Sequence, residues 1–253
     1  MCRKSRYFIV AVILVSWIGS RRDGLAQQAL GPDWSRRAEQ ALAAGKNEEA
    51  IKIVEQVVAT APQQPWVYIV RGMVFFRLGR IQESLADFDK SIELEPASKP
   101  ECWQRGISLY YLGRYDEGRE QFEVHRSVNA NDVENPFWHF MCVSKIEGVE
   151  IARTKLLPCG RDGRSPLMEV LEMLKGKMEP VQVIEAANAT HGGPEGKSLA
   201  RFYGNLYVGL YYDCLGEFDL AKKHLENCVA EKSGGYMRNV AQIHLAQLAS
   251  VKK

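Results

Sequence analysis

The chain has 253 residues, of which 46% are apolar and 25% are charged, and its formal net charge is +2 at pH 7. These proportions are typical of a globular protein and exclude an intrinsically disordered chain. The length is sufficient for one sizeable core or for an extended stack of smaller units.

The first 26 residues have the pattern of a secretory signal peptide. Three basic residues among the first six precede an apolar run over residues 7–18, and Gly24 and Ala26 provide the small residues that a cleavage site needs. A dozen apolar residues are fewer than the roughly 20 that span a bilayer, which favours cleavage after Ala26 over an uncleaved signal anchor. In either case we expect the remaining chain outside the cytoplasm, periplasmic or secreted, and an uncleaved segment would anchor it to the membrane.

The charge balance argues against a nucleic-acid partner. Residues 1–26 contain five basic side chains and one acidic side chain, so the rest of the chain has 28 basic and 30 acidic side chains. Nucleic-acid-binding proteins normally present a basic face. No run from Gln27 onward is apolar enough for a membrane helix, so any other membrane contact would be peripheral or made through a partner.

The cysteines do not have the pattern of a disulfide scaffold. Five follow residue 26, an odd number, and none forms a Cys-x-x-Cys pair. Cys102 and Cys228 lie in helical patterns and are predicted core residues, since free cysteine is often buried. Cys159 stands in a loop-like sequence, and a bridge between Cys142 and Cys159 is left open as an alternative.

Gly45, Gly79 and Gly113 recur at intervals of 34 residues, each between two amphipathic segments. Glycine at such points can end a helix in a left-handed turn. The segments 48–58, 82–94 and 116–126 have apolar residues at helical spacing. A period of about 34 residues, built as helix, turn and helix, predicts an all-α solenoid of antiparallel helix pairs.

Three units within residues 31–130 also match other positions of the tetratricopeptide repeat (TPR). The matching residues are Trp34, Gly45, Ala50 and Pro62 in the first unit, Tyr68, Gly72, Phe75, Gly79, Phe88 and Pro96 in the second, and Gly106, Gly113, Tyr115 and Phe122 in the third. By this resemblance the chain is identified as a member of the TPR family. The resemblance implies a concave face lined by the first helix of each unit.

Residues 131–197 diverge from the repeat pattern but still predict helical pairs. Helices are expected over residues 137–146 and 149–157, and two more are expected to open at Pro166 and Pro180. Loops are expected between these pairs and over residues 188–197.

A clean unit returns over residues 198–232, where Gly216 lies 103 residues, about three periods, after Gly113. The divergent middle therefore has room for two helix pairs in a continuous stack. A last helix over residues 236–250 is predicted to cap the exposed end, as terminal repeats must for solubility.

The order of these elements, and the sequence of residues 203–212, are similar to the bacterial envelope adaptors of the new lipoprotein I family. The similarity covers most of residues 34–249. It implies an envelope protease or cell-wall hydrolase as partner and a homodimer. That family is lipidated on a cysteine just after its signal, whereas Gln27 holds this position here, so no lipid anchor is expected.

Two short patterns resemble catalytic or metal sites but fail in detail. Residues 192–198 end like a phosphate-binding loop, but His191 replaces the first glycine and a helix is predicted before the loop. His139, Cys142 and Cys159 are the best candidates for a metal or thiol site, although no two histidines stand one helical turn apart. No nucleophile motif occurs, so we expect no catalytic residues, no cofactor and no metal site.

The candidate binding site is an aromatic strip on the first helices of the second and third units. Its residues are Trp66, Ile69, Met73, Phe76, Arg77, Trp103, Ile107, Tyr110 and Tyr111. Trp, Tyr and Arg often dominate binding energy. The alternative is that a neighbouring unit or the final helices cover these side chains. Ser35, Glu39, Ile69 and Met73 replace the Lys and Asn of family members that clamp a carboxylate, so an extended or helical apolar peptide fits better.

The sequence therefore predicts an exported, non-catalytic adaptor or scaffold of the cell envelope that binds another protein or peptide through this strip. A self-assembling scaffold of a secretion or polysaccharide-export complex is the alternative among binding proteins. An enzyme that uses a site in the divergent middle is the alternative from another class.

Overall fold

The computed structural model of the protein describes residues 33–251, which form helices joined by turns and loops and contain no β-strand. The predicted signal segment, residues 1–26, lies outside the described residues. Within the described range, no helix has both the length and the apolar character that crossing a membrane requires.

Three helix pairs begin the described chain. They are α2 (Trp34–Ala43) with α3 (Asn47–Thr60), α4 (Pro65–Arg77) with α5 (Ile81–Leu94), and α6 (Trp103–Tyr111) with α7 (Tyr115–His125). A short 3-10 helix, η1 (Pro96–Glu101), joins the second pair to the third. Gly45, Gly79 and Gly113 turn the chain within the three pairs at φ values of 71°, 74° and 73°. Because side chains disfavour these φ values, each repeat turns at a glycine.

A second glycine in the repeat brings the two helices of a pair close together. A Cβ atom on Gly106 would lie 2.6 Å from Cζ of Phe122, and one on Gly72 would lie 2.9 Å from Cε1 of Phe88. Each ring stands sixteen residues after its glycine, on the second helix of the pair, and both rings are buried. Glycine is needed because any larger side chain would push the ring away.

The divergent middle is also helical. It contains α8 (Glu134–Glu147), α9 (Val149–Thr154), α10 (Leu167–Leu174) and α11 (Pro180–Asn188). α9 ends three residues earlier than predicted, and a loop over residues 155–166 connects it to α10. The predicted loop over residues 188–197 is shorter than expected, because Pro194 starts the next helix at its first position, where a missing N–H has no cost.

The late unit consists of α12 (Pro194–Cys214) and α13 (Phe218–Ala230), and α14 (Gly235–Val251) follows. Gly216 turns the chain between α12 and α13 at φ 77°, as in the first three units. α14 packs on α13 and also contacts α4 of the second repeat.

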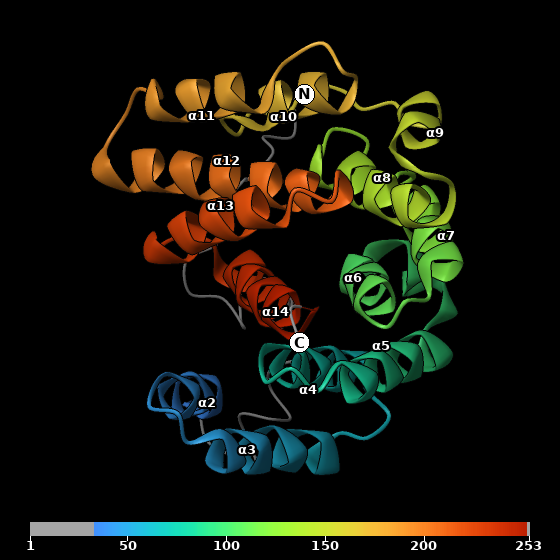
Figure 1. Ribbon diagram of the computed structural model, residues 1–253. Coiled ribbons are helices and arrows are strands. Elements are labelled where there is room, and N and C mark those ends of the chain that lie inside the picture. Colours follow the sequence, from blue (N-terminus) through green and yellow to red (C-terminus); the bar gives the residue numbers. More distant parts are fainter. Residues whose placement is uncertain (1–32, 252–253) are drawn as a thin grey trace, which may run out of the picture.

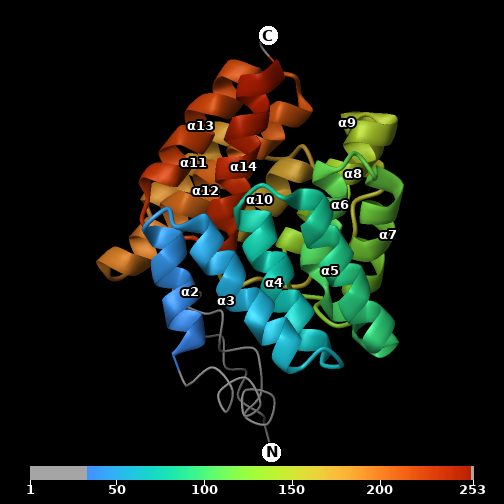
Figure 2. The same cartoon turned by 90° about the horizontal axis from the view of Figure 1, so that it is seen from below.

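The stack curves around α14. Figure 1 shows α2 and α3 at the bottom, α6 and α7 at the right and α10 to α13 at the top, with α14 between α13 and α4. Figure 2, seen from below, also places α14 beside α4. The buried apolar residues form two clusters, one spanning Trp34 to Val74 and a larger one spanning Phe76 to Leu248. The final helix therefore shares a core with the second and third repeats.

Candidate functional site

All nine residues of the predicted aromatic strip lie on α4 and α6, but most of them do not face open solvent. Five are at most 8% exposed: Trp66, Phe76, Ile107, Tyr110 and Tyr111. The other four are half-buried: Ile69, Met73, Arg77 and Trp103. The expectation of an open aromatic groove is therefore corrected, and the alternative of cover by the final helix holds for much of the strip.

Trp66 is a core residue between the first two repeats. Its ring packs against Trp34 of α2, with 6.3 Å between the ring centroids. Both rings are 3% exposed and belong to the first core cluster. Trp66 thus joins the first repeat to the second and is not available to a partner.

The concave side of the stack, formed here by α4 and α6, is called the inner face. The first turn of α14 covers one end of it. The ring of Tyr236 stacks on Phe76 of α4, with centroids 4.9 Å apart, and meets Trp103 of α6 edge-on at 5.2 Å. Offset-stacked and edge-to-face pairs of this kind are favourable beyond the area they bury. These contacts fix the N-terminal end of α14 against the second and third repeats.

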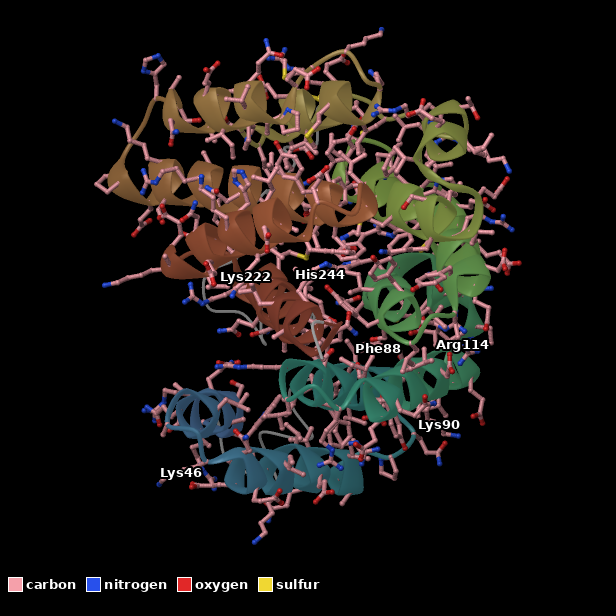
Figure 3. The ribbon with its side chains drawn as sticks, in the orientation of Figure 1. Lys46, Phe88, Lys90, Arg114, Lys222 and His244 are labelled. Carbon is pink, nitrogen blue, oxygen red and sulfur yellow. The ribbon has the colours of Figure 1, made fainter. Side chains whose placement is uncertain are left out.

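The middle of α14 is held by the last residue of α6. The Tyr111 hydroxyl lies 3.3 Å from the carbonyl oxygen of Val240, to which it can donate, and 3.2 Å from Nδ1 of His244. Figure 3 shows His244 in the interior of the curved stack, whereas Lys46 and Lys90 lie at its periphery. Burial raises the pKa of Tyr111 well above its ordinary value, and the nearby Asp213 raises it further, so this phenol stays a donor at neutral pH.

A cavity of about 260 Å³ remains on the inner face beside the C-terminal half of α14. Its lining residues come from five helices and the first residue of α13: Tyr110, Tyr111, Tyr115, Lys145, Asp213, Phe218, His244, Gln247 and Leu248. Phe218 is 43% exposed and stands where the chain enters α13. The cavity thus combines aromatic walls with hydrogen-bonding groups, which is the usual composition of a recognition pocket.

An ion pair organises this cavity. Lys145 Nζ donates to Asp213 Oδ2 at 2.8 Å, and His244 Nε2 lies 3.6 Å from the same oxygen. Burial alone would raise the pKa of Asp213, but His244 and Lys145 lower it to about 2. Burial alone would lower the pKa of Lys145, but the Asp213 carboxylate raises it above its ordinary value. Both groups are therefore charged near neutral pH.

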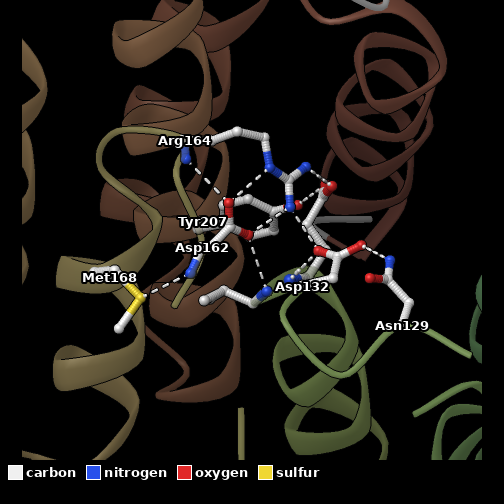
Figure 4. Close-up of polar contacts among 8 residues, drawn as sticks. Asn129, Asp132, Asp162, Arg164, Met168 and Tyr207 are labelled. Atoms are coloured by element: carbon white, nitrogen blue, oxygen red, sulfur yellow. Dashed lines mark hydrogen bonds and ion pairs between the residues drawn. The ribbon is translucent and has the colours of Figure 1, made fainter. Parts of the chain in front are cut away.

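A second ion network fixes the long loop of the divergent middle (Figure 4). The guanidinium of Arg164 donates to Asp132 at 2.6 Å, to Glu134 at 2.5 Å and to Asp162 at 2.6 Å. The Tyr207 hydroxyl of α12 also donates to Glu134. One side chain thus connects the loop over residues 155–166 to the start of α8 and, through Glu134, to the late unit.

The carboxyl groups of this network differ in their pKa values. Burial raises the pKa of Glu134 above its ordinary value, despite the opposing charge of Arg164. Burial would also raise the pKa of Asp162, but its hydrogen bonds and ion pair with Arg164 hold it below the ordinary value. The network is thus built around Arg164, whose loss would leave three carboxyl groups facing one another.

The structure does not bring His139, Cys142 and Cys159 together as a metal or thiol site. No group of three His, Cys, Asp or Glu residues in the described range could hold a metal ion. His139 Nε2 instead lies 3.4 Å from Glu123, and Cys142 packs against α7, where its sulfur lies 2.9 Å from the place of a Cβ on Gly118. The alternative Cys142–Cys159 bridge is also wrong, because all five cysteines between residues 33 and 250 are free.

The sequence did not indicate the polar residues of the inner face. Lys145, Asp213 and His244 lie on three helices, separated by 68 residues for the first pair and 31 for the second. None belongs to a short motif. The only sequence signal is that Asp213 and His244 interrupt the apolar positions of two amphipathic helices, which identifies a buried polar group without naming its partner.

Comparisons with known proteins find a matching family model and similar solved structures. Residues 67–98 match the family model described as tetratricopeptide repeat. A tetratricopeptide repeat protein from Parabacteroides merdae ATCC 43184 is similar in structure, with a TM-score of 0.49, 14% identity, and coverage of 85% of this chain and 83% of that chain. A chain in the structure of Naa15/Naa10 bound to HypK-THB has a TM-score of 0.38 and 14% identity. That match covers 92% of this chain and 35% of the other, so this chain spans about a third of its length.

The family match falls on α4 and α5, the second helix pair. The pairs on either side have the same turn glycine, and the third pair has the same close approach of glycine and phenylalanine. One matched repeat thus stands among others of equal construction. The chain therefore contains a tetratricopeptide repeat over residues 67–98 within an all-α fold of helix pairs.

Proposed function

We propose that the protein is a non-catalytic interaction scaffold that binds a segment of another protein on the inner face of its repeats. The observation that supports this best is that the inner face of α4 and α6 already holds a helix, α14, through Phe76, Trp103 and Tyr111. Concave faces of stacked repeats are extended binding surfaces in solenoid proteins. A surface that holds a helix within the chain has the shape and chemistry to hold one from another chain.

Part of this face remains accessible on α4. Ile69 and Met73 of α4 are half-buried, and Arg77 of α4 forms an ion pair with Glu39 of α2 at 2.8 Å. Glu39 is 45% exposed, so this pair stands at the edge of the face. A partner segment would meet apolar surface on α4 and a charged rim, the usual layout of a protein interface.

A peptide library displayed on phage and selected on the immobilised full-length protein tests this function. We expect a consensus peptide that binds the wild type and loses at least about tenfold in affinity on Ile69→Asp, because a charge is placed on the apolar inner face. The matched control is Ile151→Asp, since Ile151 is 41% exposed and its helix, α9, lies at the edge of the stack. Circular dichroism must show that both variants are folded. Equal binding by the two variants would place the interaction elsewhere.

We further propose that the scaffold works outside the cytoplasm, as residues 1–26 suggest, and that its partner is an envelope protein. The narrower expectations of the new lipoprotein I resemblance, a protease or hydrolase partner and a homodimer, remain predictions. Mass spectrometry of protein from fractionated cells tests the location. A mature chain that begins at Gln27 in the envelope fraction is expected, and an intact N-terminus in the cytoplasmic fraction would contradict the proposal.

A further inference from the structure

The contacts of α14 with α6 follow a regular register. Tyr236 meets Trp103 at the start of both helices, and His244 meets Tyr111 eight residues later on both. The two helices therefore run in the same direction along the inner face. The side of α14 that enters the stack contains Tyr236, Val240, His244 and Leu248, spaced by four residues and at most 9% exposed. This is the arrangement of an amphipathic helix in a groove.

α14 neither fills the groove completely nor pairs all of the buried polar groups. The hydroxyl of Tyr236 is buried without a hydrogen-bond partner, and Nε2 of His244 comes no closer than 3.6 Å to the carboxylate of Asp213. Burying a polar group without a partner costs free energy. The cavity of about 260 Å³ also lies against the C-terminal half of α14, where His244, Gln247 and Leu248 line it. A helix with different side chains at these positions could fill the cavity and pair its polar groups.

The connection to α14 is suited to movement. Gly234 and Gly235 precede or begin the helix at φ values of 113° and 52°, and two adjacent glycines leave the backbone free to take other conformations. The preceding helix, α13, packs on α12 as well as on α14, and its contact with α12 is the more extensive. Release of α14 would therefore leave the α12–α13 contact in place.

We propose that α14 is an internal ligand, and that an amphipathic helix of a partner protein binds in its place. The partner helix would present an aromatic residue to Phe76 and Trp103, an aliphatic residue one turn later, and a hydrogen-bond donor to Asp213. A bulky apolar residue near its end would fill the cavity. This inference rests on the proposed function and specifies the class of partner that the inner face recognises.

The test uses the full-length protein and a fluorescein-labelled peptide with the sequence of residues 235–251. In the variant Val240→Asp with Leu248→Asp, two charges replace buried residues of α14, so its own helix leaves the groove. The matched control, Gln242→Asp with Ala249→Asp, places the same charges on exposed positions of α14. A tethered helix competes at an effective concentration on the order of 1 mM. We therefore expect the released variant to bind the peptide at least about tenfold more tightly than the wild type or the control.

A second peptide carrying Gln247→Phe tests the cavity. We expect it to bind the released variant at least about threefold more tightly than the unaltered peptide, because the added ring fills apolar space beside Phe218. No binding by the released variant, or no gain with the second peptide, would overturn the proposal. Wild-type dimers that the peptide dissociates would also overturn it, since a second copy of this chain would then be the occupant.

If the released variant does not fold, hydrogen exchange on the wild-type protein tests whether α14 can leave the groove. Amides of α14 are expected to exchange through a local opening, before those of α6. Exchange of both helices in a single event would contradict the proposal. Failure of these tests leaves the selection with Ile69→Asp unaffected, because that residue lies outside both core clusters. The scaffold function and the identity of its ligand can therefore fail separately.

Discussion

Replacing Arg164 with methionine is expected to destabilise the protein more than any exposed charge change. Arg164 donates to three carboxyl groups, of Asp132, Glu134 and Asp162, at 2.5–2.6 Å. Breaking a fully buried ion pair by removing one partner costs about 3–5 kcal/mol. Because 35% of the Arg164 side chain is exposed, solvent screens part of the loss. We expect a decrease of about 2–3 kcal/mol in the free energy of unfolding, below the range for a fully buried pair.

Urea unfolding followed by circular dichroism at pH 7 measures this effect. The matched control is Arg114→Met, because Arg114 also makes two bonds to one carboxylate, that of Glu117, but both side chains are at least 40% exposed. An exposed pair of this kind contributes about 0–1 kcal/mol. If the two variants unfold at the same urea concentration, the network around Arg164 does not stabilise the divergent middle and our reasoning is wrong.

The effect of Arg164→Met is also expected to depend on pH. The folded-state pKa of Asp162 is lowered below its ordinary value of 3.8, so its stabilising contribution is present above that pH and is lost as the pH falls toward the folded value. Glu134, whose pKa is raised by burial, destabilises the fold when charged, and protonation relieves this. The difference between wild type and variant should therefore be largest at pH 7 and shrink as the pH falls below the ordinary pKa of Asp162.

Three further predictions concern the helix contacts and the thiols. Tyr111→Phe removes the hydroxyl that meets α14 and should cost about 1 kcal/mol, measured as a lower thermal midpoint; an unchanged midpoint would show that this contact adds nothing. Gly106→Ala should lower the free energy of unfolding by about 1–3 kcal/mol, because it overpacks the α6–α7 pair. Gly163→Ala should leave it unchanged, because Gly163 has open space around it. Equal urea midpoints for the two variants would contradict the close approach of Gly106 and Phe122. Burial raises the pKa of Cys102 to about 12 and that of Cys159 to about 11, so iodoacetamide should label both slowly at pH 7 until the protein is unfolded, and rapid labelling of the native protein would contradict this.

The repeats could be predicted because their signals are local. Gly79 and Gly113 end helices through their own backbone conformation, and Gly106 needs only the ring sixteen residues later. Such spacings are properties of a short stretch of sequence. They specify helix pairs and their order, and the structure has helices in these places with small differences at the ends.

The inner face could be predicted only in part. The positions of Phe76 and Tyr111 on the inner side follow from the repeat, but their burial depends on α14, whose His244 is 133 residues away from Tyr111. Nothing in the pattern of α14 shows which surface its apolar side covers. Arg164 likewise stands in a polar, glycine-containing segment typical of an exposed loop, and its partners become apparent only when the loop lies against α8.

The position of α14 has a consequence for the protein during its synthesis. The inner face of α4 and α6 is complete once the ribosome has made residue 111, but the helix that covers it ends at residue 251. At about 5–20 residues per second, the ribosome needs roughly 7–28 s to make the intervening 140 residues. During this time Phe76, Trp103 and Tyr111 lack their final cover. The nascent chain therefore exposes an apolar aromatic surface before α14 is available to cover it. Premature termination before α14 would leave that surface permanently exposed.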